Sequence, residues 1–352
     1  MRLLIPFIVI FAFFACYSDN NLDEKKIQFP FSMENNEGIW YFLEDKSKNR
    51  AYLSLEKIDD VNYTTNVILP DSYEAYLVGI LSDNNQTFSL NDLNSYEQVI
   101  AHLEFDSDNK PQLELEFKDK NISIEYKLSE NKINTLNFAK NMLQESLKVG
   151  LNFTVTMVDD AFLIPSNIGI EEKVLKNINE KIGYGAKSTK ELKEILKQEQ
   201  KKRIEKQENF SLYIEYINSL MPEYIDDKIL SFKDFRYEYI DIYEKNKTYS
   251  RIFSLETGEE LSSKTKDLIK TINDNKLLEI TYRKLKNAAE TGLLSRSDYK
   301  YIPLPEEFFI SKDGIEFIWY HDNYRMEKVN FRFSELKPYV KEDSKLYYLF
   351  DK

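Results

Sequence analysis

Alternating hydrophobic and polar residues fill the chain from Gly38 to Leu128 in short runs, and turn-forming residues separate these runs. In the run QLELEFK, for example, the hydrophobic side chains point to one side of an extended strand and the glutamates to the other. There are eight such runs, namely IWYFLE, RAYLSLEKI, NYTTNVIL, EAYLVGIL, TFSLND, QVIAHLEF, QLELEFK and ISIEYKL. Their connections are of hairpin length, which requires antiparallel pairing. The pattern predicts a small antiparallel eight-stranded barrel or sandwich over residues 27–128.

The period of the pattern changes after this region. Leu136, Ala139, Leu143 and Leu147 recur at helical spacing, and a glycine follows where a helix cap belongs. This spacing predicts a connecting helix over residues 129–149.

Residues 150–352 mix strand-like and helix-like patterns. Val174, Ile178 and Ile182 form one helical stripe, whereas residues 187–209 are dense in charge and predict an exposed helix or a mobile excursion. The stretch KILSFKDFRYEYIDIYEKN alternates and predicts one long strand, two helices follow it, and the strands GIEFIWYH and VNFRFSEL close the chain. We therefore expect an α+β domain, with helices packed on an antiparallel sheet.

The N-terminus is hydrophobic from Leu3 to Phe14 and then reaches Cys16, the only cysteine of the chain. With one positive charge in front, residues 1–15 are typical of a secretory signal, since a membrane span needs roughly 20 residues. The stretch FFAC resembles a bacterial lipoprotein signal, which implies a lipid on Cys16 and a polar tether over residues 16–26. An incidental cysteine in an uncleaved anchor helix remains the alternative.

A lipid anchor implies a place on the bacterial outer membrane or cell surface, with the periplasmic face also open. An exported chain with one cysteine forms no internal disulfide. The chain has 48 basic and 60 acidic residues, and loss of Arg2 with the signal changes its net charge from −12 to −13. This charge disfavours nucleic acid and anionic bilayers as partners. It suits a cationic partner, although acidic surfaces also serve solubility alone.

Gly38 and Trp40 open the strand-rich region in the run EGIWYF. This start, followed by eight strands, resembles the small lipocalin-type barrels, whose opening Gly-x-Trp closes one end. The resemblance implies a barrel that either holds one small ligand or fills with its own side chains.

The last third of the chain carries a second set of motifs. They are Thr257-Gly258 after a long strand, Phe308-Phe309 before a Lys312-Asp313-Gly314 turn, the aromatic strand Phe317–Tyr320 with Tyr324, and Ser334-Glu335-Leu336. Together they resemble DUF3298, a domain found in RsiV-type anti-sigma factors and beside DUF4163 in PdaC-type proteins. The resemblance covers residues 229–341, and a DUF4163-like start would lie upstream near residues 171–183. It implies an α+β domain and does not imply an enzyme.

Candidate catalytic and metal-binding residues are few. The only histidines, His102 and His321, are more than two hundred residues apart in predicted strands, so neither a usual zinc site nor a Ser-His-acid triad is supported. We interpret Asp159-Asp160 as a turn. The sequence therefore predicts no metal, no cofactor, no catalytic residue and a non-catalytic binding or receptor-type module. A carbohydrate-active enzyme on peptidoglycan or host glycan stays open because paired carboxylates can come from anywhere in a chain. A structural envelope component is the third class.

A binding site is predicted on the aromatic strand, at Trp319, Tyr320, His321 and Tyr324. Some members of the resembling family bind lysozyme, a cationic protein, which implies protein recognition by this domain. Rigid aromatic side chains with polar tips are enriched where proteins bind each other. The alternation of Trp319 with Phe317 favours a core position for Trp319 itself, which would leave Tyr320 and Tyr324 as the exposed pair.

Overall fold

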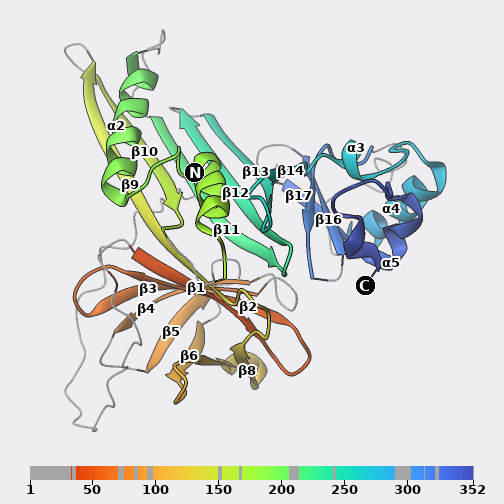
Figure 1. Cartoon of the computed structure of the whole chain (residues 1–352), viewed down its shortest axis with the longest axis horizontal. Coiled ribbons are helices and arrows are strands. Elements are labelled where there is room, and N and C mark those ends of the chain that lie inside the picture. The colour runs from red at the N-terminus through yellow and green to blue at the C-terminus, as the bar shows by residue number, and fades with distance from the viewer. Residues whose placement is uncertain are drawn as a thin grey trace.

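The computed structural model describes most of the chain after the tether (Figure 1). The described residues are 33, 37–69, 75–82, 86–92, 98–149, 153–165, 169–205, 214–240, 243–289, 303–312, 314–321 and 325–351. In chain order, the main parts of the structure are a β-barrel, a middle sheet and a C-terminal sheet with its helices.

The predicted antiparallel eight-stranded barrel is confirmed. Its strands are β1 Glu37–Glu44, β2 Arg50–Lys57, β3 Asn62–Leu69, β4 Ala75–Ser82, β5 Thr87–Asp92, β6 Gln98–Phe105, β7 Pro111–Phe117 and β8 Ile122–Leu128. Each strand pairs with the next in antiparallel register. The barrel closes where Leu43 pairs with Leu128 and Glu44 with Lys127.

The barrel interior is filled by its own side chains. Leu43, Leu53, Leu90 and Leu113 are all 0% exposed and belong to one hydrophobic cluster. On β5 the burial alternates strictly between exposed and buried residues, as the two-residue period of a strand requires. Of the two outcomes for such a barrel, the described residues fit the filled one.

The connecting helix predicted over residues 129–149 is wrong. Thr135–Val149 form a long strand, β9, which pairs with β10 (Phe153–Leu163) and with the first half of β1. Leu136 and Phe138 alternate as strand residues do, and both are buried beside β1. Pairing with the first half of β1 satisfies main-chain groups that a helix would have left unpaired there. This tertiary contact therefore favours a strand over a helix for residues 135–149.

Gly38 is required where β9 crosses β1. A Cβ atom at this position would meet the ring of Phe138 at 2.3 Å and the carbonyl oxygen of Leu55 at 2.6 Å. The ring of Phe138 therefore lies directly on the main chain of β1. It stacks on the ring of Trp40, and the two ring centres are 4.4 Å apart. The sequence motif Gly-x-Trp thus has a packing role, and the likeness to lipocalin-type barrels stays a prediction.

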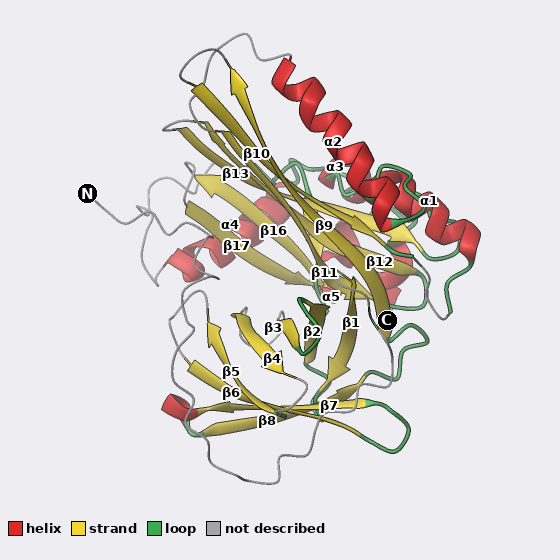
Figure 2. Ribbon diagram, turned by 90° about the vertical axis from the view of Figure 1, so that its left-hand side faces the viewer, coloured by secondary structure: helices red, strands yellow, loops and turns green. Residues whose placement is uncertain are grey.

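Two helices cover β9 and β10. The expected helix near residues 171–183 is α1, Glu172–Ile182, which ends before a glycine as predicted. Residues 187–209 contain α2, Thr189–Glu205, and the prediction that this segment is simply exposed needs correction. Leu192 and Leu196 are buried with residues of β9 and β10, so one stripe of α2 packs on the long hairpin (Figure 2).

The middle sheet has four antiparallel strands, β11 Ile214–Ile225, β12 Ile229–Ile240, β13 Tyr243–Ser254 and β14 Glu260–Leu261. The stretch that predicted one long strand is thus a hairpin of β12 and β13. Both faces of this sheet are covered. Ile229 lies in the hydrophobic cluster of the C-terminal region, whereas its neighbour Leu230 lies in the cluster shared with the barrel.

The C-terminal region is an antiparallel sheet with packed helices, as expected. Its strands are β15 Phe308–Ile310, β16 Gly314–His321 and β17 Arg325–Arg332, and its helices are α3 Thr265–Leu268, α4 Asn275–Ala289 and α5 Phe333–Leu336. Short 3₁₀ segments, Lys337–Tyr339 and Tyr347–Asp351, close the chain. Helix α4 packs against β17.

One hydrophobic cluster joins the barrel to everything that follows it. On the outside of the barrel, Trp40 and Phe42 are buried with Phe162 of β10, Ile178 of α1 and Phe232 of β12. The boundary predicted at residue 128 therefore falls beside a shared core. None of the helices in the described part of the chain is long and apolar enough to cross a membrane.

Candidate functional site

Trp319, the first residue of the predicted aromatic site, is a core residue. Trp319 is 7% exposed, packs against Phe317 and donates a hydrogen bond from Nε1 to the carbonyl oxygen of Pro303 at 2.9 Å. It belongs to the C-terminal core, because alternation along β16 turns it inward. The side chains of Tyr320 and His321, and the whole of Tyr324, lie outside the described residues.

Cys16, the predicted site of the lipid, also lies outside the described residues. Asp159 and Asp160 do not form a turn: both are residues of β10, paired with Leu143 and Met142 of β9. Within the part that the structure describes, no group of three or more His, Cys, Asp or Glu residues is placed to hold a metal ion.

His102 lies on the outer wall of the barrel between two polar side chains. Its Nδ1 is 3.0 Å from Thr87 Oγ1, and its Nε2 is 3.0 Å from Glu104 Oε1. The order hydroxyl, imidazole, carboxylate is that of a hydrolytic triad. However, the His102 and Glu104 side chains are 40% and 55% exposed, whereas stabilisation of a transition state needs a water-excluded site. We therefore interpret Thr87, His102 and Glu104 as hydrogen-bonded side chains on the surface of the barrel.

The same outer wall carries four glutamates on neighbouring strands. We call this the acidic wall, and it consists of Glu104, Glu114, Glu116 and Glu125. Glu114 on β7 pairs directly with Glu125 on β8. Ser123 donates a hydrogen bond to Glu114 at 2.5 Å, and Lys127 lies 3.2 Å from Glu125. Like charges directly opposite on a sheet are destabilising, so the wall holds a repulsive pair.

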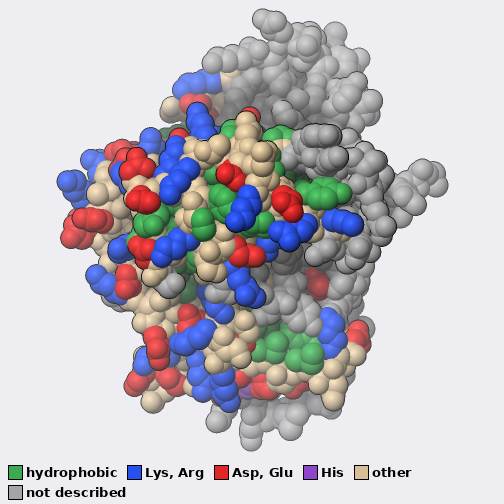
Figure 3. Space-filling view, turned by 90° about the vertical axis from the view of Figure 1, so that its right-hand side faces the viewer, with side chains coloured by type: hydrophobic (Ala, Val, Ile, Leu, Met, Phe, Trp, Pro, Cys, Tyr) green, Lys and Arg blue, Asp and Glu red, His purple; other side chains and the backbone are tan. Residues whose placement is uncertain are grey.

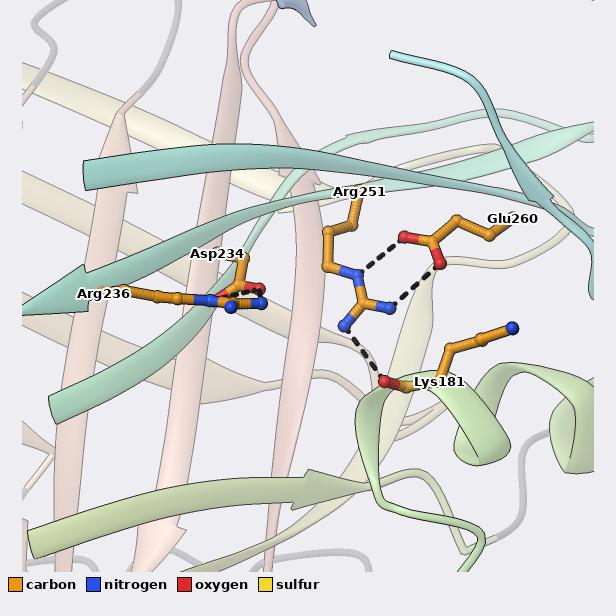
Figure 4. A network of polar contacts seen from close by, with 5 residues as sticks. All are labelled: Lys181, Asp234, Arg236, Arg251 and Glu260. Carbon is orange, nitrogen blue, oxygen red and sulfur yellow. Dashed lines mark hydrogen bonds and ion pairs between the residues drawn. The ribbon is translucent and has the colours of Figure 1, made fainter. Parts of the chain in front are cut away.

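Charges are more evenly mixed on another view of the molecule. Figure 3 shows basic and acidic side chains interspersed over the face that it draws. Figure 4 shows one such network, in which Arg251 of β13 holds Glu260 through two hydrogen bonds of 2.8 and 3.1 Å. Its third contact is the carbonyl oxygen of Lys181 at 3.1 Å, in the last turn of α1. A cation suits this position because carbonyl groups at a helix C-terminus carry partial negative charge.

Arg236 of β12 lies next to this network. It forms an ion pair with Asp234 at 2.8 Å, and its guanidinium carbon lies 4.8 Å from the ring centre of Tyr249. Lys247 approaches the same ring at 4.7 Å. Tyr249 therefore contacts two cations, of which Arg236 is also paired with Asp234.

The most unusual charges are buried between the middle sheet and the C-terminal sheet. Lys233 of β12 lies 2.6 Å from Glu223 of β11 and 3.0 Å from Glu316 of β16. The two carboxylates are only 5% and 7% exposed. The ammonium group of Lys233 thus forms ion pairs with two buried carboxylates, which come from different sheets.

The buried position of Glu223 disfavours its charged form. Burial, which is the largest cause, and the charge of Glu316 outweigh the attraction of Lys233 and together raise the pKa of Glu223 to about 7. Its Oε2 atom is buried and has no hydrogen-bond partner among the described residues. The buried hydroxyls of Ser231 on β12 and Ser250 on β13 likewise have no hydrogen-bond partner among the described residues. Sequence analysis missed this cluster, although Lys233 shares a strand face with Ile229 and Ser231 and so points inward.

No family model matches this chain, and no curated protein matches it. A DUF3298 family member from Bacteroides fragilis is similar in structure, with a TM-score of 0.47, 12% identity, and coverage of 63% of this chain and 100% of that one. A DUF3298 family protein from Pseudomonas aeruginosa has a TM-score of 0.37, 7% identity, and coverage of 58% and 95% respectively. Both of these solved structures are described as DUF3298 proteins, the family that the C-terminal motifs of this chain resemble.

Proposed function

We propose that this chain is a non-catalytic binding module of the bacterial envelope, held at the outer membrane or cell surface by a lipid on Cys16. The hydrophobic run that ends at the only cysteine supports the anchor, and the polar residues after it suit a tether. The filled barrel supports recognition at outer surfaces, because Leu43, Leu53 and Leu90 are fully buried in one hydrophobic cluster inside it.

The observation that carries the proposal is the acidic wall. Glu114 and Glu125 lie directly opposite each other on the neighbouring strands β7 and β8. A neutral pair, or a pair of opposite charges, would be more stable at these positions. Such a pair gains free energy when a cationic partner approaches, since the partner relieves the repulsion and adds attraction. We therefore propose a cationic protein as the partner, and lysozyme, to which the family resemblance points, as the first candidate.

The test is a titration of the mature chain with lysozyme at low and high salt. We expect the double variant Glu114→Gln/Glu125→Gln to bind about tenfold more weakly at low salt, and we expect high salt to weaken the wild-type complex because exposed charges are screened over about 10 Å at 0.1 M. The matched control is Glu256→Gln/Glu279→Gln, which removes the same charge from exposed positions of the C-terminal half. Equal loss in both double variants would reject the wall as the binding surface, and the absence of binding at low salt would reject lysozyme.

The anchor has its own test. Cys16→Ser removes the only thiol that can carry the lipid, so the variant should leave the membrane fraction and lose acyl labelling. A variant that stays in the membrane fraction and is still acylated would contradict the proposed attachment, whatever the titration shows.

A further inference from the structure

The buried charges lie at the place where three parts of the molecule meet. Glu223 belongs to β11 of the middle sheet, and its main-chain carbonyl oxygen accepts a hydrogen bond from Tyr52 of the barrel. Its side chain reaches Lys233 on the next strand. Lys233 in turn reaches Glu316 on β16 and lies 5.5 Å from the ring centre of Phe309 on β15. A single residue is therefore connected to the barrel, the middle sheet and the C-terminal sheet.

Two carboxylates share one ion-pair partner at this joint. Four ionisable groups face one another across it: Glu223 and Lys233 from the middle sheet, and Glu316 and Lys328 from the C-terminal sheet. Among the described residues, only Lys233 forms an ion pair with Glu223, and it is shared with Glu316. A buried carboxylate oxygen without a hydrogen bond is costly when charged and much less costly when protonated.

We propose that Glu223 is a proton-binding site that controls how firmly the C-terminal sheet docks on the middle sheet. With a proton on Glu223, Lys233 and Glu316 form a simple buried pair across the two sheets. Without it, two carboxylates compete for one ammonium group, and the contact between β12 and β16 weakens. The site is independent of the acidic wall, since it lies between the middle sheet and the C-terminal sheet, whereas the wall lies on strands β6 to β8 of the barrel.

The sign of the pH dependence follows from the direction of the shift. A carboxyl group whose pKa is raised in the folded state binds more protons when folded than when unfolded, so the stability it supplies falls as the pH rises. For Glu223 the window runs from the ordinary value of 4.5 to about 7. Across it, the folding equilibrium constant should fall by roughly a hundredfold through this one residue.

The experiment uses the full mature chain. Urea unfolding at pH 5 and pH 8 should show a loss of stability toward pH 8 that Glu223→Gln largely removes, because the amide has nearly the shape of the protonated acid and does not titrate. The protection factors of the main-chain amides of β16, which compare exchange with the intrinsic rate at each pH, should fall toward pH 8 in the wild type and stay level in the variant. The control is Glu279→Gln, an exposed glutamate of α4, which should keep the wild-type pH dependence.

A direct titration protects the test against a variant that does not fold. In the wild-type chain, carbon NMR should show one carboxyl group that titrates near pH 7 and is missing in Glu223→Gln. Glu316→Gln should move that titration to lower pH, because it removes the neighbouring negative charge. The proposal is overturned if no carboxyl group titrates above about pH 6, or if Glu223→Gln keeps the pH dependence of the β16 protection factors.

Discussion

The hydroxyl group of Tyr52, in the second strand of the barrel, donates a hydrogen bond to the carbonyl oxygen of Glu223, 171 residues further along the chain. Tyr52 is 1% exposed, although it points away from the barrel interior. Arg50, two residues earlier, lies 5.0 Å from the ring centre of Tyr224. The outside of the barrel is thus an interior surface of the whole molecule, and its polar groups are paired accordingly.

Tyr52→Phe should lower the free energy of unfolding by about 1 kcal/mol, because it removes one buried hydrogen bond and leaves the carbonyl group of Glu223 without this partner. Urea denaturation of the mature chain measures the change. Tyr184→Phe is the control, since Tyr184 is 44% exposed, and it should change stability by less than about 0.5 kcal/mol. Equal effects of the two substitutions would show that the contact between barrel and middle sheet contributes nothing.

A fragment of residues 27–128 should be less stable than the same region in the whole chain. It would expose Trp40, which in the whole chain stacks on Phe138 and also lies 5.9 Å from Phe162. Trp40 is the only tryptophan of the fragment, so its fluorescence should be red-shifted relative to a fragment of residues 27–165, which restores both phenylalanines. A short fragment that unfolds cooperatively at the urea concentration of the longer one would support the independent domain that the sequence predicted.

Gly258→Ala should cost about 3 kcal/mol, from a positive φ of +72° and from a clash of the new Cβ with α1. The Cβ would lie 2.4 Å from the carbonyl oxygen of Val174 and 2.7 Å from the Cβ of Asn177. Gly185→Ala is a matched control, because its φ is also +72° while its nearest neighbour is 3.9 Å away. Thermal unfolding of both variants therefore separates close packing from backbone strain. If they lose equal stability, the turn is not pressed against α1.

Arg251→Lys should cost about 1.5 kcal/mol, because an ammonium group cannot reproduce the two parallel hydrogen bonds to Glu260 together with the contact to Lys181. Arg236→Lys is the control. The side chain of Arg236 is 53% exposed, so its ion pair with Asp234 should matter less than about 0.5 kcal/mol. Urea denaturation in low and high salt compares the two, and a larger loss for Arg236→Lys would contradict this ranking.

Local pattern was sufficient for the elements whose partners lie close in sequence. Strands β1 to β8 pair with their immediate neighbours, so alternation and hairpin connections alone predicted the barrel. The same holds for α1, whose apolar stripe and terminal glycine are local features. In the C-terminal region, the aromatic alternation of β16 already allowed Trp319 to be a core residue, and the structure places it there.

Tertiary structure decided what depends on contacts between distant segments. Residues 135–149 have apolar spacing that suits a helix, yet the free edge of β1 made them a strand. The buried cluster could not be derived, because Glu223, Lys233 and Glu316 come from three strands and only packing brings β16 over β12. Sequence by itself determined the barrel, the α+β ending and the acidic charge. Which face of each element is buried, and which charges share one ammonium group, followed from long-range packing that no local period encodes.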